Sequence, residues 1–156
     1  MGKAKEAKAS FAKGVELAPN CPPPRLSLAQ QHLAAGDADL ALAEIESVLK
    51  LRPNHEHALA ISGAAYMRKA EPDKALASFK RALDLNPKSA AANLNIGAAY
   101  VAKKQYGEAL KYYEQGFALA PANMAALGAI PQVHFLEGNS KAAFARVERE
   151  LKNSQN

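Results

Sequence analysis

Small, apolar and helix-breaking residues recur along this chain in a constant order. Four prolines, each preceded two positions earlier by a leucine, lie 34 residues apart: Pro19, Pro53, Pro87 and Pro121. Residues 56–89 show the internal pattern most fully, with Leu59, Ser62-Gly63, Tyr66, Ala75 and Phe79, and residues 90–123 follow it with Ile96-Gly97, Tyr100, Ala109 and Tyr113. A fixed period of this size indicates a repeat architecture in which each unit packs on its neighbours.

The pattern predicts a pair of helices in each repeat. Polar turns separate the two halves of the repeats, at Gly36-Asp37, Glu71-Pro72-Asp73, Gln105-Tyr106-Gly107 and Gly138-Asn139-Ser140. Alanine is abundant while isoleucine, valine and threonine are scarce, which favours helices over strands. The proline that ends each repeat has no N–H and cannot extend the second helix. We therefore predict an all-α fold of about nine helices, the first at about 4–17 and the others in four antiparallel pairs.

The repeat boundaries follow from the prolines. We predict repeats at 22–55, 56–89 and 90–123 and a degenerate terminal repeat at 124–156. Residues 1–21 match the second helix of a repeat whose first helix is missing, so we expect the chain to be part of a longer array. Pro131 stands in the glycine place of the last repeat, and a proline inside a helix costs roughly 3 kcal/mol. We expect the helix there to start late or to kink.

Small residues are expected where helices cross closely. Gly63 and Gly97 lack a side chain on the first helix, and Ala41, Ala75, Ala109 and Ala143 are small on the second. The next core layer is predicted to consist of Ile45, Phe79, Tyr113 and Val147.

These markers, at one strict spacing over almost the whole chain, resemble the tetratricopeptide repeat. The resemblance implies a right-handed superhelical solenoid of helix-turn-helix repeats. It also implies that the first helices line a concave groove that holds a segment of a partner protein. The side chains expected to face that groove are Leu26, Gln30, Leu33, Ala60, Ala64, Met67, Arg68, Leu94, Asn95, Ala98, Val101, Gln132, Phe135 and Leu136.

The expected groove is mostly apolar. Relatives that clamp a C-terminal carboxylate carry lysines where this chain has Leu26, Ala60, Ala91 and Ala125, which argues against that function. We predict a protein–protein interaction scaffold that binds an apolar peptide or an amphipathic helix. The alternative is a non-catalytic segment of a larger bacterial assembly, secretion or enzyme complex. A helical-repeat nucleic-acid binder is disfavoured, because the net charge of +5 is spread without a basic block.

Nothing in the sequence points to catalysis, a cofactor or a metal, so we predict a protein that is not an enzyme. His32 and His134 occupy tyrosine places and are expected to pack in the core. His55 and His57 are two residues apart, which directs them to different sides of a helix. The glycines form no phosphate-binding loop.

The remaining expectations concern the environment of the chain. No apolar run has the length of a membrane span, and residues 1–10 lack the apolar core of a signal peptide, so we expect a soluble protein, cytoplasmic rather than periplasmic. Cys21 is the only cysteine. The first helix has no partner for Phe11 and Val15, which predicts self-association through residues 1–20.

Overall fold

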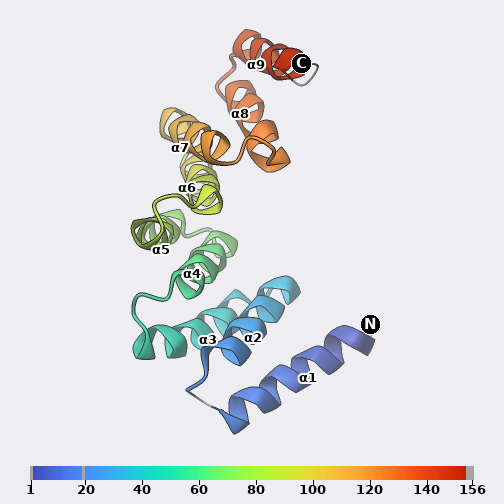
Figure 1. Ribbon diagram of the computed structural model, residues 1–156, viewed down its shortest axis with the longest axis vertical. Helices are drawn as coiled ribbons and strands as arrows, with labels where there is room; N and C mark the ends of the chain where they lie inside the picture. The colour runs from blue at the N-terminus through green and yellow to red at the C-terminus, as the bar shows by residue number, and fades with distance from the viewer. Residues whose placement is uncertain (1, 19, 154–156) are drawn as a thin grey trace. The chain divides into compact units, whose positions relative to one another are not determined.

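The computed structural model describes residues 2–18 and 20–153, which form nine helices and no strand (Figure 1). The helices are α1 (Gly2–Leu17), α2 (Pro22–Ala35), α3 (Ala38–Leu51), α4 (Glu56–Arg68), α5 (Pro72–Leu85), α6 (Ala90–Ala102), α7 (Tyr106–Leu119), α8 (Met124–Leu136) and α9 (Ser140–Asn153). The predicted all-α fold and the number of helices are confirmed. None of the helices in the described ranges is long and apolar enough to cross a membrane.

The helix ends lie where the turn residues place them. Helices α1, α3, α5 and α7 end at Leu17, Leu51, Leu85 and Leu119, each two residues before a repeat proline. The first helices of the later repeats begin with a side chain that accepts a backbone N–H. His55 Nδ1 accepts from Ala58, Ser89 Oγ from Ala92, and Asn123 Oδ1 from Ala125, at 3.4, 3.2 and 2.9 Å. Each cap pairs a donor that the helix itself leaves free.

The chain forms two compact units, and the first comprises residues 1–86. In this unit α2 pairs with α3 and α4 with α5, while α4 also packs on α3 and α1 packs on α2. Ala41 and Ala75 are fully buried, as predicted. A Cβ placed on Gly63 would lie 2.3 Å from Cε1 of Phe79, so the backbone of α4 passes directly over that ring. The predicted close crossing at Gly63 is confirmed.

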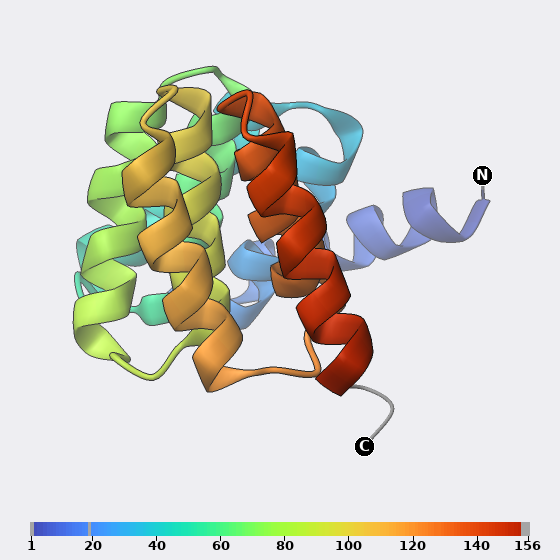
Figure 2. The same cartoon turned by 90° about the horizontal axis from the view of Figure 1, so that it is seen from above.

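The second unit comprises residues 87–156. Here α6 pairs with α7 and α8 with α9, and α8 also packs on α7. Figure 2 shows α6 and α7 side by side in yellow and gold. Ala109 and Ala143 are fully buried, and a Cβ on Gly97 would lie 2.7 Å from the ring of Tyr113. The same small-residue packing therefore operates in both units.

Of the two outcomes expected at Pro131, the late start is excluded and the kink stays a prediction, while a second expectation for the last repeat is corrected. Helix α8 begins at Met124 and contains Pro131 in its interior, so the helix does not start late. The proline leaves the carbonyl of Leu127 without its intrahelical N–H. Val147 was expected in the core, but it is 42% exposed. In the described residues α9 packs on α8 and on no other helix.

Candidate partner-binding surface

In the first unit, the surface predicted to meet a partner lies on α2 and α4. Leu33 on α2 and Ala60, Ala64 and Met67 on α4 are partly exposed, and Gln30 and Arg68 are exposed. Leu26 lies elsewhere: it is 8% exposed and belongs to the core cluster that includes Ala29, Ala41 and Ala58. The alanines of that cluster leave room for the longer leucine side chain. Leu26 therefore offers almost no surface to a partner.

A polar pair joins the two helices on this surface. Gln30 Nε2 of α2 lies 3.1 Å from His57 Nε2 of α4, and both side chains are exposed. His57 was not among the residues expected on this surface. A signal was present, since His57 precedes Ala60 by three positions and residues at that spacing share a helix face. The pair adds hydrogen-bonding groups to an otherwise apolar strip.

In the second unit, the predicted residues lie on α6 and α8 and differ strongly in exposure. Leu94, Asn95, Ala98 and Val101 on α6 are only partly exposed, and Leu94 and Val101 pack against the core cluster of this unit. On α8, Gln132, Phe135 and Leu136 are exposed, the latter two at 49% and 48%. The large apolar side chains that reach solvent are therefore concentrated on α8 rather than distributed evenly over the first helices.

The exposed aromatic residues of the second unit form a pair. The rings of Phe135 on α8 and Phe144 on α9 meet edge to face, with centroids 5.6 Å apart, and Phe144 is 62% exposed. This geometry is favourable for two aromatic rings. Phe144 was not predicted for this surface, because only first-helix positions were expected to contact a partner.

His32 and His134 lie near acidic side chains, and His55 and His57 make hydrogen bonds within the fold. His32 is 7% exposed and its Nδ1 lies 3.9 Å from Oδ2 of Asp37, while Nδ1 of His134 lies 3.4 Å from Oε2 of Glu137. His55 caps α4 and His57 faces Gln30, so the two histidines point to different partners, as expected. Among the residues that the structure describes, no group of three His, Cys, Asp or Glu side chains could hold a metal ion.

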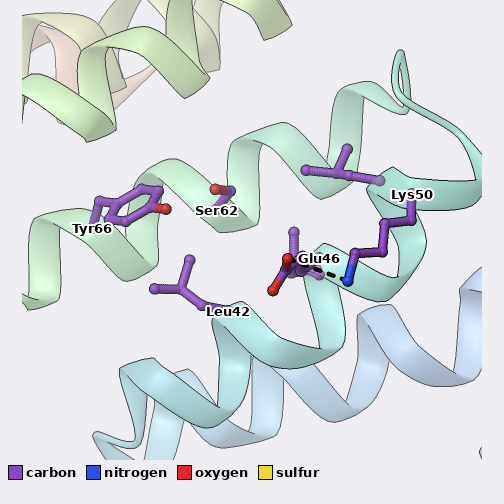
Figure 3. Close-up of a pocket in the computed structure, with 7 residues that line it drawn as sticks. Leu42, Glu46, Lys50, Ser62 and Tyr66 are labelled. Carbon is purple, nitrogen blue, oxygen red and sulfur yellow. Dashed lines mark ion pairs between the residues drawn. The ribbon is translucent and has the colours of Figure 1, made fainter.

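A pocket of about 310 Å³ lies between α3 and α4 in the first unit (Figure 3). Its lining comprises Leu42, Ile45, Glu46, Leu49 and Lys50 from α3 and Ser62 and Tyr66 from α4. Glu46 Oε1 and Lys50 Nζ are 3.4 Å apart at its edge, and both side chains are largely exposed. None of the residues predicted for the groove lines this pocket, so it is a separate feature.

One side of the Tyr66 ring is already occupied by a cation. Lys74 Nζ lies 5.5 Å from the ring centroid and 2.6 Å from Oε2 of Glu71. The hydrogen bond to Glu71 raises the pKa of Lys74, and the same bond lowers the pKa of Glu71. Both groups are therefore ionised around neutral pH, and they fix a charged pair beside the pocket.

Sequence comparison shows the family. The model described as "Tetratricopeptide repeat" matches residues 26–90 and 62–123, which together cover more than half of the chain. The chain therefore belongs to the tetratricopeptide repeat family, and its fold is an all-α solenoid of such repeats. No curated protein sequence matches it significantly. The fold is a scaffold for protein–protein interaction, and its repeats are typically non-catalytic.

Solved structures share this fold. MamA from Desulfovibrio magneticus RS-1, residues 41 to the end, superposes with a TM-score of 0.86 at 24% identity, covering 99% of this chain and 89% of that one. Another crystal structure of MamA gives 0.84 at 21% identity, with 99% and 90% covered. TTC0263, a thermophilic tetratricopeptide repeat protein of Thermus thermophilus, gives 0.81 at 21% identity, with 97% and 83% covered. At these identities the likeness concerns the fold.

Proposed function

We propose that the chain is an interaction scaffold whose first-helix surfaces hold an apolar peptide or an amphipathic helix of a partner protein. The observation that carries this proposal is the exposure of Phe135 and Leu136 on α8, the first helix of the last pair. Large side chains that remain half exposed contribute strongly when a partner covers them. The edge-to-face contact with Phe144 gives Phe135 a defined orientation before binding.

The first unit contributes a different surface to the proposal. Met67, Leu33, Ala60 and Ala64 form a partly exposed apolar strip, and the Gln30–His57 pair lies on the same two helices. A partner helix with an apolar stripe and a few polar residues is complementary to that mixture. The short alanine side chains at positions 60 and 64 leave the backbone of α4 accessible for close approach.

Selection from a displayed peptide library, followed by calorimetry on the selected peptides, tests the proposal. We expect apolar or amphipathic sequences whose affinity falls at least tenfold with Met67→Glu or Phe135→Glu. The control is Leu40→Glu on α3, since Leu40 is 52% exposed and is not one of the groove residues. Selected peptides that are polar, or whose binding survives both substitutions, would contradict the proposal.

A further inference from the structure

Three of the seven side chains that line the pocket between α3 and α4 are smaller than their counterparts in the second unit. Two repeat periods separate positions 45, 49 and 62 from positions 113, 117 and 130. The first set is Ile45, Leu49 and Ser62, whereas the second set is Tyr113, Phe117 and Ile130. In the first unit these three smaller side chains lie beside a space of about 310 Å³.

In the second unit, the corresponding place contains an arginine supplied by α9. Arg146 is 7% exposed, its Nη1 lies 2.7 Å from Oε1 of Glu114, and its Cζ lies 4.9 Å from the centroid of the Phe117 ring. Nε of Arg146 is 3.1 Å from Oε1 of Glu150. A carboxylate on α7 and an apolar surface beside it thus hold a guanidinium group of the following second helix.

The first unit keeps the carboxylate of this arrangement and lacks the arginine. Glu46 is the counterpart of Glu114, and Leu49 is the counterpart of Phe117. The counterpart of Arg146 is Ser78, a buried residue of α5 whose Oγ lies 3.3 Å from Oγ of Ser62. Ser78 therefore provides no positively charged group to pair with Glu46, and the pocket stays open beside the Glu46 carboxylate.

We propose that this pocket binds an arginine side chain of a partner protein. The guanidinium pairs with the Glu46 carboxylate, for which two parallel N–H···O bonds are the favoured geometry. The methylene stem of the arginine packs along Leu42 and Leu49, and the Ser62 and Tyr66 hydroxyls are the polar groups of the opposite wall (Figure 3). The arrangement reproduces between two proteins what Glu114, Phe117 and Arg146 do within one chain.

Lys50 competes with the proposed ligand. Its ammonium group lies 3.4 Å from Glu46, but the lysine side chain is 73% exposed and the pair is an i,i+4 surface pair. Such pairs contribute little and rearrange readily. The counterpart of Lys50 in the second unit is Ala118, so no lysine at that position competes with Arg146 for Glu114. Removing the lysine should therefore strengthen arginine binding.

Nuclear magnetic resonance titration of the whole chain with N-acetyl-arginine amide tests the proposal, with the uncharged N-acetyl-citrulline amide as the matched control ligand. We expect shifts of the Leu42, Ile45 and Leu49 methyl groups with a millimolar Kd for arginine, the affinity range of so small a ligand. Citrulline should bind at least tenfold more weakly. Glu46→Gln should remove the difference between the two ligands, and Lys50→Ala should tighten arginine binding several-fold.

A second arm supplies the arginine from within the chain. Ser78→Arg should fill the pocket and abolish binding of the arginine amide, while Ser78→Ala should retain it. If Ser78→Arg unfolds the chain, the Glu46→Gln and Lys50→Ala variants decide the question. Equal shifts for arginine and citrulline, or arginine binding that survives Glu46→Gln, would overturn the proposal. Met67→Glu, which tests the groove, should leave arginine binding unchanged.

Discussion

Gly63→Ala is the sharpest test of the close crossing between α4 and α5. The added methyl group would lie 2.3, 2.5 and 2.7 Å from Cε1, Cδ1 and Cζ of Phe79. Phe79 is 2% exposed, so its ring cannot turn into solvent to make room. Either the ring leaves its rotamer or α4 moves away from α5, and both responses disturb the contact between the paired helices.

The expected magnitude combines two opposing effects. Overpacking a core costs about 1–3 kcal/mol, and a clash this close belongs at the upper end. Alanine in a helix interior is favoured over glycine by about 0.8–1.0 kcal/mol. The net loss of stability is therefore about 2 kcal/mol. For a chain of this length each kcal/mol corresponds to about 2–4 °C, so Tm should fall by about 4–8 °C.

Gly128→Ala is the matched control, because Gly128 lies inside α8 and a Cβ there would meet nothing within 4 Å. This substitution should raise the stability by about 0.8–1.0 kcal/mol. Both variants are compared by calorimetry and by hydrogen exchange, which locates the change within the array. In a Phe79→Leu background Gly63→Ala should cost less, since the two positions are in contact. A Gly63→Ala chain that melts above the wild type would refute the close crossing as the reason for the glycine.

Three further predictions concern the turns, acid sensitivity and the first helix. Ala70 has φ 56° where Gly36 and Gly138 stand in the equivalent turns, and the left-handed region costs about 1–2 kcal/mol for a residue with a Cβ. Allowing for the greater freedom of unfolded glycine, Ala70→Gly should stabilise by up to about 1 kcal/mol. Ala77→Gly, on the exposed face of α5, should instead destabilise the chain by about 1 kcal/mol in urea melts. If Ala70→Gly also destabilised the chain by that amount, the strain at Ala70 would be contradicted. Because hydrogen bonding from Lys74 lowers the pKa of Glu71, the carboxylate stabilises the fold at neutral pH and loses that effect as pH falls through its lowered pKa. The Tm difference between wild type and Glu71→Gln should therefore shrink toward acid pH, and a constant difference would exclude this linkage. Finally, Phe11 is half-buried and Leu17 is 78% exposed on α1, so we expect concentration-dependent association in sedimentation that Phe11→Ser weakens; a monomer at every concentration would contradict it.

Much of the fold could be predicted because the period of 34 residues reflects the packing between the two helices of each repeat. The four alanines at 41, 75, 109 and 143 are each fully buried, and Gly63 and Gly97 each lie against an aromatic ring. Size restrictions of this kind act between the two helices of one repeat, and they leave a direct trace in the sequence. The proline positions likewise determine where the second helices end.

The exposure of individual side chains could not be predicted in the same way. Val147 occupies a core place by its spacing, yet it is 42% exposed, and in the part of the chain that the structure describes α9 packs on α8 and on no other helix. Leu26 occupies a groove place, yet its side chain is buried in the core cluster, where its neighbours include small alanines. Alignment to a period shows which positions are equivalent, but burial depends on the sizes of all the neighbours.

The pocket between α3 and α4 shows what a comparison of equivalent positions can add. When a repeat keeps one residue of an interacting pair but lacks its partner residue, the remaining residue can make the same contact with another protein. Glu46 and Glu114 are the same residue type two periods apart, while Ser78 and Arg146 are not. Because Arg146 pairs with Glu114 at 2.7 Å within the second unit, the geometry of a carboxylate–guanidinium contact at this position of the fold is known from the chain itself. A partner arginine at Glu46 requires only that the missing half of that contact come from another protein.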